Sequence, residues 1–482
     1  MKTIAIVGGG FCGTMTAVNL ARLSIEALRV VVVNDRFPTG RGIAYGTTHP
    51  DHLLNVVARN MSAFPDLPSH FVDWLRTRCE FSEIPLAEVR EQFMPRRVYG
   101  DYLQDILFWH VHPVVGPGRV QIELVEDEVI DLEPAGIGRV ARIVLRAGDA
   151  VDADRVVLAT GNPAPHDIVP PGPVRDHPAY CGNPWRGWQE RLPDAGEDVL
   201  LVGTGLTMID AFLTLRSLGW RGTVHTVSRT GLLPLAHFKG SDYPAFPPEA
   251  VETMGLRALA EMIEEHCTIV RAAGMNPAIV VDKLRPYTQR IWRNLPAADR
   301  RAFARHYRTR WNVVRHRIPP SVAAIIADAQ NEGRLVIHKG KLGALRCEGH
   351  HIVATVEPGD DGSPRELAVA LILNCTGPRE APGDEPGALM QSLLERGLVR
   401  PDELDMGIEV TPDFAVVDRE GKPSDVLFAL GPLLKGTLWE TTAVPELRAQ
   451  AHQVASAVLS ARPRLQPDWA QETPENLVEY YI

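Results

Sequence analysis

Two glycine-rich turns have the spacing needed to hold the pyrophosphate of a dinucleotide. The first turn follows an apolar, β-branched stretch at residues 3–7 and reads GGGFCG over residues 8–13. Gly8 permits the tight turn, and Gly10 lets the backbone approach a pyrophosphate. Gly13 lets the following helix pack on the strand, and the N-terminus of that helix would face the anion. The pattern predicts a strand, a phosphate-binding turn and a helix.

An acidic residue at the end of the next strand supports this interpretation. Residues 28–33 read as a second apolar strand, and Asp35 follows it. An acid at this position can accept a hydrogen bond from a ribose hydroxyl. A Rossmann-like turn without a ligand would not need that acid, so we interpret the N-terminal region as a dinucleotide site.

The second turn repeats the order of elements with one departure. Residues 198–202 read as a strand, Gly203 and Gly205 follow, and residues 223–227 read as the next strand. The third glycine is replaced by Met208, whose side chain must be accommodated between helix and strand.

The end of that next strand indicates which nucleotide binds there. Ser228 and Arg229 stand where an NAD site would carry an acid. A hydroxyl and a guanidinium suit a 2'-phosphate, so we predict NADPH. The alternative is that Arg229 is a solvated loop residue.

Two dinucleotide folds in one chain favour electron transfer from a nicotinamide to a flavin, so we assign FAD to the first fold. Similar turns follow two further predicted strands, at Thr160 and Gly161 and at Gly431. The predicted class is α/β, with two Rossmann-like dinucleotide-binding domains. The NADPH domain (190–370) would be inserted into a discontinuous FAD domain (1–165 and 370–482), and it would carry a helical insert at about 250–335.

The insert contains a dense basic segment, residues 308–317, with interleaved aromatic residues. Arg315 and His316 are candidate contacts for an anionic substrate, because a bidentate arginine recognises planar anions well. The alternatives are a solvated helix face and a structural histidine. No side chain is assigned a catalytic role.

Composition excludes several classes of function. The chain has 482 residues, 45% of them apolar and 23% charged, and a net charge of −10. This negative charge argues against nucleic acid as a partner, and no apolar run reaches the length of a membrane span. The six cysteines are scattered without a CxxC pair, so we expect no metal site, no redox dithiol and no disulfide framework. The short apolar run at residues 4–7 is cut by glycines and does not suit a signal peptide, so we expect a cytoplasmic protein. The sequence does not indicate an oligomeric state.

Five further segments combine glycine, aromatic and charged residues: GRGIAYG (40–46), HLLNVVARNMSAFP (52–65), PRRVYGDY (95–102), SRTGLLP (228–234) and LWETTAVPELR (438–448). Together with residues 203–210, they resemble the bacterial FAD/NAD(P)-binding family that is related to the flavin-containing and N-hydroxylating monooxygenases. The resemblance extends along the whole chain and implies that loops around Arg41, Asn55 and Ser62 surround FAD.

The resemblance also implies a reaction. NADPH would reduce the flavin, and oxygen would then form a C4a-hydroperoxyflavin that hydroxylates a small-molecule substrate. Our specific hypothesis is urate hydroxylation to 5-hydroxyisourate, a step of purine metabolism. The alternative is N-hydroxylation of a small amine or amino acid, which an acidic pocket residue would favour. A flavin oxidase or dehydrogenase and a non-catalytic nucleotide-binding protein also stay open.

Overall fold

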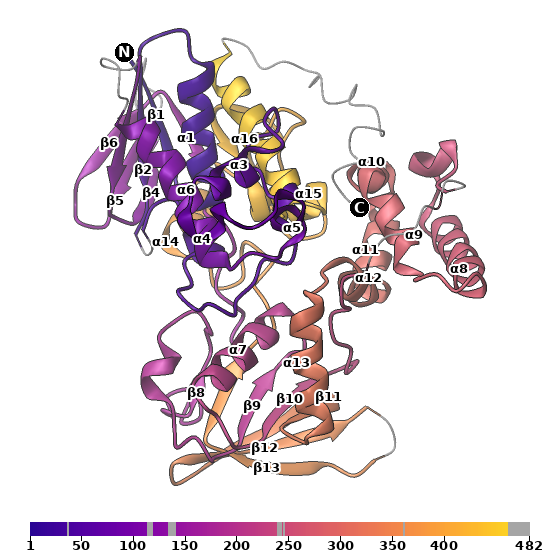
Figure 1. The fold of residues 1–482 in the computed structure, drawn as a ribbon. Helices are drawn as coiled ribbons and strands as arrows, with labels where there is room; N and C mark the ends of the chain where they lie inside the picture. Colours follow the sequence, from indigo (N-terminus) through magenta and orange to yellow (C-terminus); the bar gives the residue numbers. More distant parts are fainter. Residues whose placement is uncertain are drawn as a thin grey trace.

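The computed structural model describes residues 1–35, 38–112, 119–133, 141–238, 243, 246–359 and 362–460. Figure 1 shows two sheets with their helices, one above the other, and a group of helices beside them. The strands of the upper sheet come from both ends of the described chain, and those of the lower sheet come from its middle. The predicted α/β fold class is confirmed.

The first sheet has the strand order β15-β16-β7-β1-β2-β3. All neighbours are parallel except β15, which pairs antiparallel with β16. Nearly every residue of β2 is buried, as expected for a parallel strand covered on both faces. The strands are β1 (Lys2–Val7), β2 (Leu28–Val33), β3 (Val120–Val125), β7 (Arg155–Leu158), β15 (Ala415–Val417) and β16 (Pro423–Ala429).

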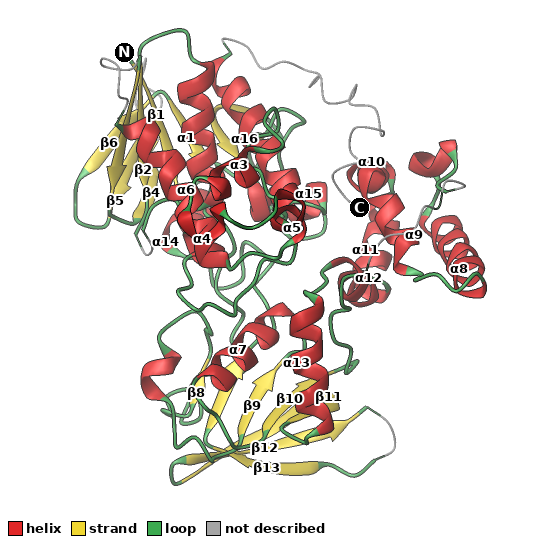
Figure 2. Cartoon of the chain, in the orientation of Figure 1, coloured by secondary structure: helices red, strands yellow, loops and turns green. Residues whose placement is uncertain are grey.

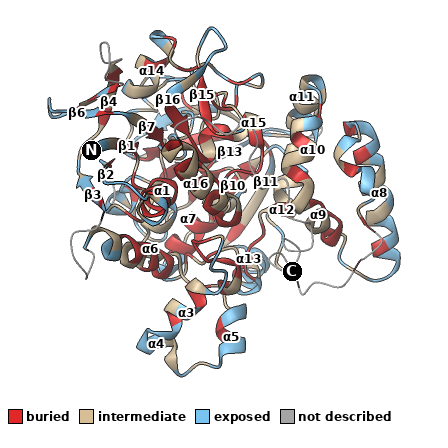
Figure 3. Cartoon of the chain, turned by 90° about the horizontal axis from the view of Figure 1, so that it is seen from above, coloured by how far each residue is buried: buried red, intermediate tan, exposed pale blue. Residues whose placement is uncertain are grey.

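Helices from distant parts of the chain cover this sheet. Figure 3 shows that buried residues gather on its strands and on α1 and α16. An antiparallel sheet of β4 (Val129–Glu133), β5 (Ala141–Leu145) and β6 (Ala150–Ala153) adjoins it. The helices are α1 (Phe11–Leu23), α2 (Gly42–Tyr45), η1 (Ala58–Asn60), α3 (His70–Arg76), α4 (Cys79–Ser82), α5 (Leu86–Glu91), α6 (Arg96–Val111), α14 (Ala388–Glu395), η5 (Gly431–Leu434), α15 (Lys435–Leu438) and α16 (Val444–Leu459).

The second sheet has the order β13-β12-β11-β10-β9-β14-β8. Strands β8, β14, β9, β10 and β11 run parallel, and β12 and β13 extend the sheet as antiparallel strands. Its elements are β8 (Tyr180–Cys181), η2 (Trp188–Arg191), β9 (Val199–Val202), α7 (Leu206–Ser217), β10 (Val224–Ser228), α13 (Pro320–Asn331), β11 (Leu335–Glu348), β12 (His351–Pro358), β13 (Arg365–Val369) and β14 (Leu371–Asn374).

The remaining helices form a third core, which Figure 2 shows beside the two sheets. Trp439, from the segment before α16, packs into this core. Helix α13 does not belong to this third core, because its buried residues pack on the second sheet. The helices of the third core are η3 (Glu249–Thr253), α8 (Leu256–Ala272), α9 (Ala278–Leu284), η4 (Arg285–Tyr287), α10 (Thr288–Asn294), α11 (Ala297–His306) and α12 (Arg308–Arg315).

In the part of the chain that the structure describes, no helix is both long and apolar enough to cross a membrane.

Candidate functional site

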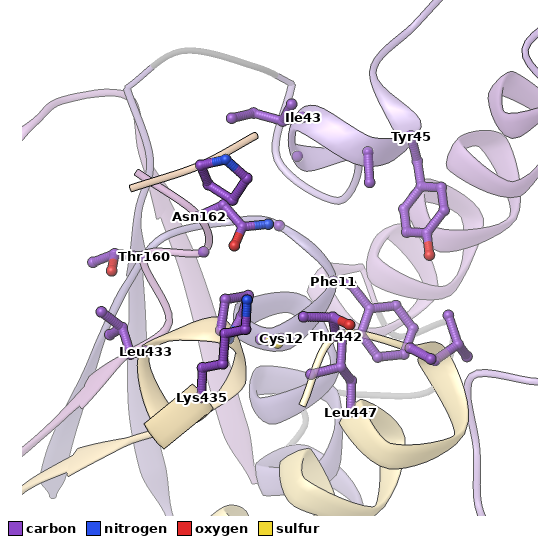
Figure 4. A pocket seen from close by; sticks show the side chains of 18 of the residues that line it. Phe11, Cys12, Ile43, Tyr45, Thr160, Asn162, Leu433, Lys435, Thr442 and Leu447 are labelled. Atoms are coloured by element: carbon purple, nitrogen blue, oxygen red, sulfur yellow. The ribbon is translucent and has the colours of Figure 1, made fainter. Parts of the chain in front are cut away.

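One large cavity, of about 1540 Å³, lies where the two sheets and the helical core meet. Its wall includes the first glycine turn, the start of α7, and residues of α9, α12 and the 432–447 segment. Figure 4 shows the part in front of α1, with Ile43 and Tyr45 on one side and Lys435, Thr442 and Leu447 on the other. The cavity therefore brings together segments that are far apart in the sequence.

The first turn has the geometry that a pyrophosphate site requires. Gly8 has φ +107°, and a Cβ there would lie 2.4 Å from the carbonyl oxygen of Ala159. A Cβ on Gly13 would lie 1.8 Å from the carbonyl oxygen of Gly8, so helix and strand are in close contact. A Cβ on Gly10 would meet only the Cα of Gly42, at 3.6 Å. Helix α1 has no side-chain cap and no acid in its first turn, so its N-terminus suits an anion.

The second turn repeats this geometry at two of its three positions. Gly203 has φ +115°, and a Cβ there would lie 2.5 Å from the carbonyl oxygen of Cys375. No described atom lies within 4 Å of a Cβ on Gly205, the residue before α7. Met208, in place of the third glycine, is fully buried in the core of the second sheet. Helix α7 also lacks a side-chain cap and a first-turn acid.

Most of the residues that the sequence predicts around FAD lie in the cavity wall. Asp35, Asn55, Thr160 and Gly161 line the cavity together with Gly8 and Gly10. Arg41 also lines it, and its guanidinium is held by Asp101 and by Gln104, whose Oε1 accepts a hydrogen bond at 2.8 Å.

Besides Gly13, two of the residues predicted around FAD do not belong to the wall. Gly431 is buried, and a Cβ there would lie 2.9 Å from the Sγ of Cys12, which lines the cavity. Ser62 is fully buried, and its hydroxyl donates to the carbonyl oxygen of Leu67 at 2.6 Å. Its own carbonyl oxygen accepts a hydrogen bond from Arg448 at 3.0 Å. In this structure Ser62 shapes the loop and does not face the cavity.

Of the residues predicted for NADPH, Ser228 and Arg229 stand at the end of β10. The Ser228 hydroxyl is 2.9 Å from that of Thr204 and accepts a hydrogen bond from the Gly231 amide at 3.0 Å. Arg229 follows the strand and is exposed. Leu206 and Thr207, the first residues of α7, connect this end of the second sheet to the cavity wall.

Arg315 and His316 both line the cavity, but Arg315 has acidic neighbours. It donates to Oε2 of Glu440 at 3.0 Å and lies 3.6 Å from Oε1 of Glu446. Burial and, after it, the positive charge of Arg315 lower the pKa of His316 to about 4, so the imidazole is neutral at neutral pH.

The acidic residues of the wall are the functional candidates that sequence reasoning missed. Burial alone would raise the pKa of Glu440, but the positive charge of Arg315 holds it below its ordinary value. Glu380 behaves in the same way, because burial is outweighed by Lys435 and Arg308. Glu440 stands inside the LWETTAVPELR segment, but its partner is 125 residues away, and no local signal connects the two.

Comparison with known proteins gives a consistent picture. Residues 5–163 match the family model described as FAD-NAD(P)-binding, and no curated protein sequence matches the chain. The ornithine N-hydroxylase of Kutzneria sp. 744 superposes with a TM-score of 0.64 at 16% identity, over 94% of this chain and 98% of that one. The ornithine hydroxylase of Pseudomonas aeruginosa gives 0.66 at 14% identity, over 95% and 98%.

A cadaverine monooxygenase of the desferrioxamine pathway from Erwinia amylovora gives a TM-score of 0.63 at 15% identity, over 97% of both chains. Identities this low establish the fold alone. The predicted resemblance is thus confirmed: the chain has the fold of these N-hydroxylating monooxygenases, with an FAD-NAD(P)-binding domain at residues 5–163.

Proposed function

We propose that this chain is an FAD- and NADPH-dependent monooxygenase that N-hydroxylates a small primary amine or amino acid. The observation that carries the proposal is the shared cavity, because the first glycine turn and the start of α7 both belong to its wall. Its volume of about 1540 Å³ exceeds the roughly 300–1,000 Å³ of an ordinary ligand pocket. Two nucleotides and a small substrate therefore have room to meet.

The residues present fit FAD at the first turn. The open position at Gly10 and the uncapped α1 suit the pyrophosphate, and Asp35 suits a ribose hydroxyl. Thr442 and Ala443, directly before α16, also line the cavity, so the positive end of this helix would stabilise negative charge on a reduced flavin. Once reduced by NADPH, the flavin supplies the activation of oxygen.

The second turn fits NADPH by the same reasoning. Gly205 and α7 would hold the pyrophosphate, and Ser228 and Arg229 would hold the 2'-phosphate. This assignment makes residues 190–370 the NADPH domain within an FAD domain formed by 1–165 and 370–482, as the sequence predicts.

The charges in the wall favour an amine over urate. The buried carboxylate of Glu440 and the half-buried carboxylate of Glu380 lie beside the cations Arg315 and Lys435, and such alternating charges suit a zwitterionic amino acid. The similar structures are named for ornithine and cadaverine, which are amines. The urate hypothesis gains no support from them.

NADPH oxidation by the FAD-loaded protein tests the proposal, with ornithine, lysine, cadaverine, aspartate and urate added separately. We expect one amine to stimulate oxidation and to yield a hydroxylamine with little hydrogen peroxide. Stimulation by urate with consumption of urate would restore the urate hypothesis. Oxidation that ends wholly in peroxide with every compound would indicate a flavin oxidase, and no oxidation would indicate a nucleotide-binding protein without turnover.

A further inference from the structure

Three metal-binding side chains come together on the second sheet, at a place that the proposed reaction does not use. Glu197 precedes β9, and His350 and His351 stand at the turn between β11 and β12. One ligand atom from each residue lies within 4.8 Å of the other two, and Nε2 of His351 is 2.9 Å from Oε2 of Glu197. The described residues of the cavity wall do not include any of the three.

The backbones that carry these side chains are held in place by other contacts. The Glu197 amide donates to the carbonyl oxygen of Asp194 at 2.9 Å. A Cβ on Gly222 would lie 2.0 Å from the carbonyl oxygen of Glu197, so this loop is closely packed. Nε2 of His177 donates to the carbonyl oxygen of Gly349 at 3.1 Å, in the turn that carries His350. The three side chains are therefore presented by a fixed framework.

We propose that Glu197, His350 and His351 form a binding site for Zn²⁺ or a divalent transition-metal ion of similar preference. Two imidazoles and one carboxylate are a ligand set that zinc prefers, whereas Mg²⁺ and Ca²⁺ prefer oxygen ligands alone. His350 is exposed, so water completes the coordination. The ion connects the β11–β12 turn to the loop before β9 and stabilises the second sheet.

Titration calorimetry of the full-length, FAD-loaded protein with Zn²⁺ tests the site directly. We expect one ion per chain, and His351→Ala and His350→Ala each to weaken binding on the order of tenfold or more. The matched control is His306→Ala, which removes an exposed histidine from α11 and should leave binding unchanged. Zn²⁺ should also raise the melting temperature of the wild-type protein, because it binds the folded state.

Glu197→Gln separates metal binding from a structural role. The amide can keep a hydrogen bond to His351 but loses the charge, so the metal-free melting temperature should stay the same while Zn²⁺ affinity falls. Equal Zn²⁺ affinity in the wild type and in all three variants would overturn the proposal. One ion per two chains, with dimers formed on addition of Zn²⁺, would overturn it as well.

Discussion

The two glycine turns meet the same steric demands at two positions and differ at the third. A Cβ on Gly8 or on Gly203 would lie within 2.5 Å of a carbonyl oxygen at the end of a neighbouring strand. Gly10 and Gly205 leave room for an approaching ligand. The first position is thus fixed by the turn, the second leaves the space that a nucleotide would need, and both glycines are visible in the sequence.

The third position depends on how each helix packs on its sheet. In the first turn a Cβ on Gly13 would lie 1.8 Å from the carbonyl oxygen of Gly8, so only glycine fits. In the second turn Met208 fills the corresponding space and is fully buried. The missing glycine therefore reflects a different packing of helix on strand and leaves the open position at Gly205 unchanged.

The two turns also differ in how they meet the cavity. Gly8, Gly9 and Gly10 line it directly, whereas the second turn reaches it through Leu206 and Thr207, and Arg229 is exposed. This difference matches a flavin that stays bound and a nicotinamide nucleotide that exchanges.

The largest effect should follow from Gly13→Ala. The added methyl group would force α1 away from β1, and overpacking of this kind costs about 1–3 kcal/mol. We expect a lower free energy of unfolding and a protein purified with little FAD, measured by urea unfolding and by flavin absorbance. Met208→Leu is the control, since a volume-conserving change costs less than about 1.5 kcal/mol. A Gly13→Ala protein that retains FAD and is as stable as the wild type would contradict this. The contact between α1 and β1 would then be no closer than that between α7 and β9.

Arg229→Ala tests the assignment of the second turn. Hydrogen bonds to charged groups contribute about 1.5–3 kcal/mol, so the KM for NADPH should rise about 10- to 100-fold. The KM for NADH should not change, and neither should the FAD content. Arg216→Ala, which removes an exposed arginine from the last turn of α7, is the control. An unchanged KM would identify Arg229 as a solvated loop residue.

Gly10→Ala and Gly205→Ala should have smaller and separate effects. Neither methyl group meets a described atom closer than 3.6 Å, so both proteins should keep their stability. Each methyl group would hinder one pyrophosphate, so Gly10→Ala should lower FAD affinity several-fold, and Gly205→Ala should raise the KM for NADPH several-fold. If either variant lost the binding of both FAD and NADPH, the assignment of the two turns to separate nucleotide sites would be wrong.

A pH-dependent effect concerns His237, a residue of the cavity wall that donates to the carbonyl oxygen of Asn55 at 2.8 Å. Burial lowers its pKa from 6.5 to about 4, so the unfolded chain binds more protons between these values. The free energy of unfolding should fall as the pH drops from 6.5 towards 4 and should be steady above 6.5. His237→Gln keeps a hydrogen-bond donor but removes the titrating group, so the difference in the free energy of unfolding between pH 5 and pH 7 should become smaller. Urea unfolding at the two pH values measures this difference. Part of it should remain, because the pKa of His316 is lowered as well.

Sequence reasoning succeeded where the physical requirement is local. The strand at residues 28–33 is identical to β2, and the positive φ at Gly8 and Gly203 follows from turns that the glycine spacing marks. It missed the acidic residues of the cavity wall. Glu440 contacts Arg315 because the helical core packs against the segment before α16, and this long-range packing leaves no local pattern in the sequence.

In this account, the nucleotides held by the two turns react with each other in the shared cavity. Anaerobic mixing of the FAD-loaded protein with NADPH tests this most directly. We predict rapid loss of the absorbance of oxidised flavin, which is much slower with NADH or in the Arg229→Ala protein. A protein that retains FAD and binds NADPH but leaves its flavin oxidised would contradict the claim.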